Sequence, residues 1–100
     1  MRKIRLHARA ETDLIEIWLH SFEEWDEAQA DRYVDRLNSA IRTLATNAHR
    51  GVKRDNILKG YRVLFVNRHA VYYIVTSTTV EVVRVLHAQM DPDRHLEGTS

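Results

Sequence analysis

Three runs of β-branched and aromatic residues follow one another almost without interruption in the second half of the chain. YRVLFV (61–66) and HAVYYIV (69–75) are separated only by Asn67 and Arg68, and VEVVRVL (80–86) comes after a short polar link. Asn tolerates a positive φ, so a two-residue hairpin turn fits between the first two runs. Links this short join antiparallel neighbours, because a parallel pair needs a long crossover. The sequence therefore predicts a three-stranded antiparallel meander.

The first half of the chain has mostly helical periodicity. RKIRLH (2–7) alternates apolar and charged residues and predicts a short half-buried strand, but apolar residues then repeat at helical spacing over 8–25 and over 30–44. Asp26 can cap the second helix by accepting a hydrogen bond from the backbone near Gln29. The two helices are then joined by a tight turn, which predicts an antiparallel helical hairpin. Its expected apolar positions are Ala10, Leu14, Ile17, Trp18, Ser21, Phe22 and Trp25 in the first helix, and Ala30, Tyr33, Leu37, Ala40, Ile41 and Leu44 in the second.

These elements predict a single α+β domain. The expected order is an N-terminal strand, an antiparallel helical hairpin and a three-stranded antiparallel meander, with the helices on one face of the sheet. The stretch 47–60 has no sustained periodicity and is expected to be a loop. A chain of 100 residues has the size of one domain, so we assign all of 1–100 to it.

The composition excludes several classes of protein. The chain is 44% hydrophobic with 3 Gly and 1 Pro, which is typical of a globular protein and not of a disordered one. It has no Cys, so disulfides and thiolate metal sites are excluded. It also lacks an apolar run of the kind found in a membrane span or a signal peptide. We expect a cytoplasmic protein with no cofactor and no membrane partner.

The first two strands of the meander are apolar on both faces. In 61–66 and 69–75, both alternating sets of residues are mainly aliphatic or aromatic, as expected when both faces of a sheet are covered. One helical hairpin covers only one face. The other face is expected to be shielded by the C-terminal tail, a second copy or a partner, or else to lie half exposed.

Charge is distributed unevenly along the chain. Residues 8–38 contain nine acidic residues and three arginines, whereas 50–75 contain six basic residues and the single acid Asp55. This distribution predicts two differently charged surfaces, which are either partner sites or ordinary solvated faces. A basic strip this short does not establish nucleic-acid binding.

Three blocks of the chain have the order and composition of one known protein family. They are HARAETDLIEIW (7–18), GYRVLFVNRHAVYYIV (60–75) and VEVVRVLHAQMDPDRHL (80–96), and with the second helix they span nearly the whole chain. In these blocks the chain resembles the ParE branch of the RelE/ParE toxin superfamily of bacterial type II toxin–antitoxin systems.

The resemblance implies a toxin that inhibits DNA gyrase without being an enzyme. It also implies neutralisation by a ParD-like antitoxin, in a hetero-oligomer of the two proteins. Such an antitoxin has a ribbon-helix-helix part and a disordered C-terminal segment that wraps the toxin, and the toxin reaches promoter DNA only through it. A segment that folds on binding would bury a large apolar surface, which fits the second apolar face of the sheet. A relative that has lost toxicity and serves only as an antitoxin-binding scaffold is a further hypothesis.

The main alternative within the superfamily is a RelE-like ribonuclease that cuts mRNA in the ribosome. Cleavage at a 2′-OH needs charge stabilisation and a proton donor in one place. Most positions of the predicted strands are apolar, and the tail has no Tyr. Arg62, Arg84 and His87 could form a catalytic set only if the fold brings them together.

The end of the last strand and the segment after it contain residues that could form a metal site. His87, Asp91, Asp93 and His95 have ligand-type side chains within nine residues, but their spacing matches no known metal motif. Asp91 is also a good N-cap, and Pro92 suits a first helical position. A locally capped turn therefore explains these residues without a metal.

Arg84 is a charged residue within an apolar strand. Strict alternation predicts that it shares a face with Val82 and Leu86, opposite Val83 and Val85. It could cover apolar neighbours with its stem or pair with an acid on the first helix. It could instead pair with a carboxylate of the antitoxin or contact the target.

The aromatic residues Trp18, Trp25, Tyr33 and Tyr73 lie at core spacings and are expected to pack rather than to stack on bases. No catalytic, cofactor-binding or metal-binding residue is assigned. The residues expected to contact the antitoxin or the target are Leu14, Trp18, Arg62, Tyr72, Arg84, His87, Met90, Asp91 and Arg94.

Overall fold

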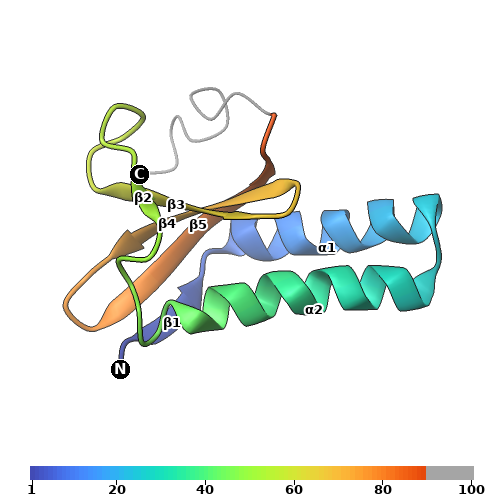
Figure 1. The fold of residues 1–100 in the computed structure, drawn as a ribbon, viewed down its shortest axis with the longest axis horizontal. Coiled ribbons are helices and arrows are strands. Elements are labelled where there is room, and N and C mark those ends of the chain that lie inside the picture. Colours follow the sequence, from blue (N-terminus) through green and yellow to red (C-terminus); the bar gives the residue numbers. More distant parts are fainter. Residues whose placement is uncertain (90–100) are drawn as a thin grey trace.

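The computed structural model describes residues 1–89, which form a five-stranded sheet with a helical hairpin packed on one face (Figure 1). The predicted α+β class and the order of its main elements are confirmed. No helix within these residues is long and apolar enough to cross a membrane. The helices and strands are β1 (Lys3–Leu6), α1 (Ala8–Glu24), α2 (Glu27–Thr43), β2 (Val52–Lys53), β3 (Tyr61–Val66), β4 (His69–Val75) and β5 (Thr79–His87).

The sheet extends the predicted meander by one strand at each edge. β3, β4 and β5 are antiparallel neighbours, and Asn67 has the positive φ of 54° that the hairpin turn requires. β1 lies beside β5 and runs parallel to it, so the sheet is mixed. At the other edge, Val52 and Lys53 of β2 pair with β3, inside the stretch expected to be loop. Two residues are too few to produce a period, which is why the pattern missed this strand.

The turn of the helical hairpin follows from the predicted cap. The Asp26 carboxylate accepts a 2.7 Å hydrogen bond from the backbone N–H of Gln29, and α2 begins there. The prediction that Phe22 and Trp25 lie in the core is wrong, since their exposed fractions are 46% and 51%. The far end of the hairpin projects beyond the sheet (Figure 1), so the sheet does not cover the end of α1.

Both faces of the sheet carry a buried apolar cluster, as the strand pattern predicts. On the helix side the sheet packs against α1 and α2, and on the other side the loop residues Ile57 and Leu58 pack against the second cluster. The helix-side core contains Leu14, Leu37, Ile41, Leu44, Leu64, Val71, Tyr73, Val80, Val82 and Val85, among others. The outer core contains Tyr61, Val63, Ala70, Tyr72, Val83 and Leu86.

A β-bulge changes the expected face of the residues around Arg84. Tyr72 pairs with Arg84 but Tyr73 pairs with Val82, so Val83 is an extra residue on β5. Alternation is therefore interrupted there, and the prediction that Val82 shares a face with Leu86, and Val83 with Val85, is wrong. Val82 and Val85 belong to the helix-side core, and Val83 and Leu86 to the outer core.

The Tyr73 hydroxyl joins the sheet to the segment after α2. We therefore expect its removal to lower the stability of the fold. Tyr73 is fully buried; its hydroxyl donates to the Ala48 carbonyl and accepts from the Gly51 N–H, both at 2.8 Å. In Tyr73→Phe these two buried backbone groups lose their partner, so we expect the free energy of unfolding to fall by about 1–3 kcal/mol in urea denaturation. Tyr61→Phe is the matched control, because the buried Tyr61 hydroxyl has no hydrogen-bond partner among the described residues. Equal losses in the two variants would contradict this account.

Candidate functional site

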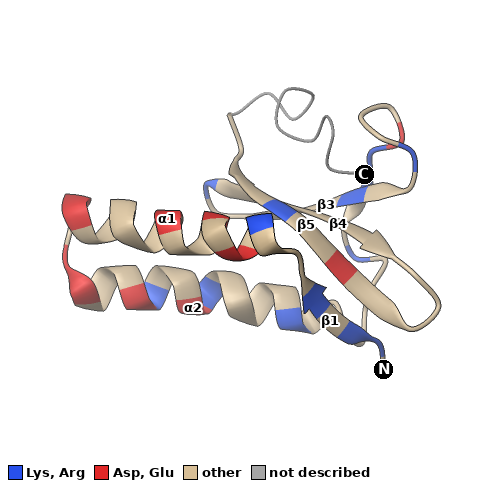
Figure 2. Cartoon of the chain, turned by 180° about the vertical axis from the view of Figure 1, so that it is seen from behind, with Lys and Arg blue, Asp and Glu red and all other residues tan. Residues whose placement is uncertain are grey.

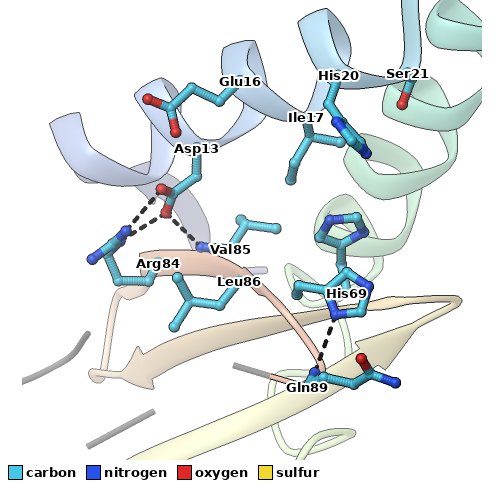
Figure 3. Close-up of a pocket in the computed structure, with 11 residues that line it drawn as sticks. Asp13, Glu16, Ile17, His20, Ser21, His69, Arg84, Val85, Leu86 and Gln89 are labelled. Atoms are coloured by element: carbon cyan, nitrogen blue, oxygen red, sulfur yellow. Dashed lines mark hydrogen bonds and ion pairs between the residues drawn. The ribbon is translucent and has the colours of Figure 1, made fainter. Parts of the chain in front are cut away.

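A cleft of about 570 Å³ opens between α1 and the end of the sheet where β4 begins and β5 ends (Figure 3). One wall is the sheet-facing side of α1, and the other is formed by the last residues of β5 together with His69 of β4. The lining combines apolar side chains with a carboxylate–guanidinium pair and three histidines. The residues of this lining are Asp13, Glu16, Ile17, His20, Ser21, His69, Arg84, Val85, Leu86, His87 and Gln89.

A buried ion pair holds α1 against β5 at one end of the cleft. The Asp13 carboxylate accepts from Arg84 Nε at 2.8 Å and from Arg84 Nη2 at 2.9 Å, and both residues are 7% exposed. This bond and the charge of Asp13 raise the pKa of the Arg84 guanidinium above its usual range. Of the alternatives considered for Arg84, the structure contains the pairing with an acid on the first helix.

The same carboxylate also replaces a missing strand neighbour. β1 pairs with β5 only as far as Leu6 and Val82, so within residues 1–89 the edge of β5 beyond that point has no strand beside it. The Val85 N–H donates to the Asp13 carboxylate at 2.9 Å. Asp13 thus satisfies a buried backbone donor as well as a buried charge, and an unsatisfied group of either kind would be costly.

A histidine cluster forms the other end of the cleft. Tyr33 Oη of α2 lies 2.6 Å from His69 Nδ1, and the rings of His69 and His87 meet edge to face with centroids 5.5 Å apart. Burial, together with the nearby His87, His20 and Arg68, lowers the pKa of His69 to about 4. His69 is therefore neutral at pH 7, where it acts as a hydrogen-bonding group and not as a cation.

The depressed pKa of His69 predicts a loss of stability in acid. The unfolded chain binds a proton at His69 below about pH 6.5, while the native state resists it down to about pH 4. This contribution to the free energy of unfolding is complete above about pH 6.5 and is lost as the pH falls toward about 4. His69→Gln removes the titrating group, so urea denaturation at about pH 7.5 and about pH 4.5 should give a smaller pH difference than in the wild type. His49→Gln, at an exposed position, should match the wild type; the same pH difference in both variants would contradict the assignment.

The structure places the sequence-predicted contact residues in different environments. Only Arg84 and His87 line the cleft. Leu14 and Tyr72 are buried in the helix-side core and the outer core, so neither offers a contact surface. Trp18 is half-buried on α1 and donates to the Asp31 carboxylate at 2.8 Å.

The remaining predicted residues lie away from the cleft or outside the described chain. Arg62 donates to the backbone carbonyls of His49 and Gly51 and does not line the cleft, so the set Arg62, Arg84 and His87 is not brought together in it. The sequence-based expectations for Met90, Asp91 and Arg94, and for the metal interpretation that includes Asp93 and His95, fall outside residues 1–89.

The sequence reading missed most of the cleft. The pairing of Asp13 with Arg84 did have a signal in the sequence. Asp13 lies at helical spacing among the apolar positions of α1, and Arg84 lies within an apolar strand, where a buried cation needs an acidic partner. His20 and His69 carried no such signal. They are far apart in the sequence, and only the packing of α1 beside the β3–β4 hairpin brings them into one cleft.

Comparison with known proteins agrees with the fold and with the resemblance of the three sequence blocks. The family described as "ParE toxin of type II toxin-antitoxin system, parDE" matches residues 4–92. "Toxin ParE1" of Mycobacterium tuberculosis (strain ATCC 25618 / H37Rv) is 41% identical over 92 residues, covering 91% of this chain and 94% of its own. "Toxin ParE1" of Caulobacter vibrioides is 36% identical over 96 residues, covering 96% and 99%.

A solved structure shows the same fold at low sequence identity. It is described as "Chromosomal ParDE TA system from P. aeruginosa", and the matched chain superposes with a TM-score of 0.80 at 19% identity, covering 89% of this chain and 98% of that one. The family match spans most of the chain, and the two relatives match over almost their full lengths. The chain therefore belongs to the family of ParE toxins of type II toxin–antitoxin systems.

Proposed function

We propose that this toxin inhibits DNA gyrase by direct protein–protein contact and is neutralised by a ParD-like antitoxin whose C-terminal segment occupies the cleft between α1 and β5. Family membership supports the toxin role, and the gyrase target is inferred from the ParE branch. A ParDE system is named in the description of the structural neighbour, which supports an antitoxin of the ParD type as the partner.

The observation that carries the antitoxin site is the apolar lining of the cleft. Ile17 of α1 is half-buried and lies in the wall of the cleft opposite the end of β5 (Figure 3), and an apolar groove between packed elements can take the apolar face of a partner segment. The segment would insert apolar side chains between the walls. It would also meet His20, His69 and His87, whose ring nitrogens can hydrogen-bond to its backbone or polar side chains.

The polar groups of the cleft favour binding over catalysis. Arg84 could stabilise developing charge on a phosphate, but its guanidinium is already engaged in two hydrogen bonds with Asp13. Arg62 likewise donates to two backbone carbonyls of the segment after α2. A ribonuclease would need a free cation beside its proton donor. We therefore propose a non-enzymatic toxin, and ribosome-dependent mRNA cleavage is the competing hypothesis.

The test adds purified toxin to a gyrase supercoiling reaction and, separately, to a translating extract in which mRNA ends are mapped by primer extension. We expect loss of supercoiling with intact mRNA, and recovery of supercoiling when the antitoxin is added in equimolar amount. Ribosome-dependent cuts with normal supercoiling would overturn the proposal in favour of the ribonuclease. Antitoxin binding with neither effect would identify a scaffold that has lost toxicity.

A further inference from the structure

The outward side of α1 carries a row of exposed apolar residues that the fold does not use. Ile15, Leu19 and Phe22 have exposed fractions of 61%, 48% and 46%. Their spacing of four and three residues places them on one side of the helix. The half-buried ring of Trp18 adjoins the row, because it stacks on Phe22 with centroids 5.4 Å apart. A contiguous row of large apolar side chains on a small domain indicates an interaction site. We call Ile15, Trp18, Leu19 and Phe22 the α1 apolar row.

The α1 apolar row is distinct from the cleft. The α1 residues that line the cleft are Asp13, Glu16, Ile17, His20 and Ser21, and none of them belongs to the row. The row lies on the other flank of the helix, where the Trp18 indole N–H donates to Asp31 of α2 at 2.8 Å. The toxin thus has two apolar surfaces on opposite flanks of one helix, and two partners could use them independently.

The rim of the row is acidic. Glu16 and Glu23 border it on α1, and Asp31 borders it on α2; all three are exposed. No Lys or Arg occurs between Glu11 and Asp31. Figure 2 shows this predominance of acidic residues along α1 and at the turn of the hairpin, whereas α2 carries both acidic and basic residues. A partner that docks on the row therefore meets negative charge on both sides.

This charge decides between the occupants that an apolar row could have. A second copy of the toxin would bring two acidic rims together, which would repel each other. A helix that presents an apolar stripe flanked by Lys and Arg would bury the row and pair with the rim. Such complementarity also steers the encounter of the two proteins.

We propose that the α1 apolar row is the docking surface for a basic amphipathic helix of the toxin's protein target. The inference rests on the proposed function, because it assumes a toxin that acts by contact with a target protein. It assigns the target and the antitoxin to opposite flanks of α1. The antitoxin would then bind in the cleft and block access of the target to the α1 apolar row by steric hindrance, without contacting the row itself.

A pair of double variants tests the surface in the full-length toxin. L19K/F22K removes two apolar side chains from the row and reverses local charge, while V52K/F65K makes the same kind of change at exposed positions of β2 and β3. We expect L19K/F22K to raise the toxin concentration needed for half-inhibition of gyrase by about tenfold or more, with V52K/F65K unchanged. Antitoxin affinity should stay within about twofold in both. Loss of antitoxin binding in L19K/F22K would overturn the proposal and assign the row to the antitoxin.

A second measurement does not depend on gyrase and separates failure of this inference from failure of the proposed function. Two designed amphipathic helical peptides with the same apolar stripe, one flanked by Lys and one by Glu, are titrated into the toxin. Binding is followed by the fluorescence of Trp18 and Trp25. We expect the Lys-flanked peptide alone to bind, more weakly to L19K/F22K and at higher salt. Equal binding of both peptides, or a concentration-dependent toxin dimer that L19K/F22K abolishes in sedimentation, would overturn the inference even if gyrase is inhibited. If gyrase is not inhibited but the peptides bind as expected, the docking surface is supported and only gyrase as the target is ruled out.

Discussion

Asp13→Ala is expected to lower the free energy of unfolding by about 3–5 kcal/mol, a large share of the ~5–15 kcal/mol available to a domain of this size. The carboxylate accepts three hydrogen bonds, two from the Arg84 guanidinium and one from the Val85 N–H. Its removal takes two hydrogen bonds from the buried Arg84 guanidinium and leaves the buried Val85 N–H without its acceptor. It also releases α1 from the edge of β5, so the cleft should lose its shape.

Urea denaturation of three variants, D13A, E16A and D13L/R84M, distinguishes this from a general effect of losing an acid from α1. Glu16→Ala removes an exposed carboxylate one turn along the same helix and should change stability by less than about 0.5 kcal/mol. D13L/R84M replaces both buried charges with apolar groups and should be more stable than D13A alone. If D13A lost less than about 1 kcal/mol, the ion pair would not be what joins α1 to the sheet.

Ile17→Lys is expected to weaken antitoxin binding by about a hundredfold. Ile17 contributes to the apolar wall of the cleft, and a docked segment would have to strip water from the new ammonium group without a partner for it. Asp13 is the nearest buried acid, but it is already paired with Arg84. Binding is measured by isothermal titration of the antitoxin into the toxin.

Ile15→Lys is the matched control for this change. It makes the same substitution on the same helix two residues earlier, at a position that is 61% exposed and outside the cleft. Antitoxin affinity should stay close to that of the wild type. Thermal melting of both variants checks that Ile17→Lys leaves the fold intact, since the half-buried lysine can extend its head to solvent. Equal loss of antitoxin affinity in the two variants would refute the cleft as the antitoxin site.

The elements that could be predicted from the sequence are those that depend on neighbouring residues. The hairpin turn at Asn67 and the cap at Asp26 are local, and both are found. The position of β1 is not local, because its partner on β5 begins at Thr79, far along the chain. The bulge at Val83 arises from the pairing of two strands, so the pattern of β5 alone could not show it. This is why Val82 was wrongly predicted to share a face with Leu86, and Val83 with Val85.

The candidate site was less predictable than the fold. Arg84 and His87 were singled out because a charge or an imidazole stands out in an apolar strand, and both line the cleft. Their neighbours His20 and His69 look like ordinary polar residues in the sequence. They come together in the cleft only when α1 packs beside the sheet. Trp18 and Phe22 of the row on α1 were predicted as core positions, because helical spacing shows that apolar residues share a side but not whether anything covers it.

Whether this toxin acts on gyrase by contact can be read from the state of the DNA after the gyrase reaction. Gyrase, supercoiled plasmid and ATP are incubated with the toxin, the reaction is stopped with detergent and protease, and linear DNA is measured. If the toxin stabilises the cleaved gyrase–DNA complex, linear DNA will accumulate with toxin concentration and will be suppressed by prior addition of the antitoxin. Unchanged DNA in this reaction, together with ribosome-dependent mRNA cleavage by the same preparation, would contradict the account.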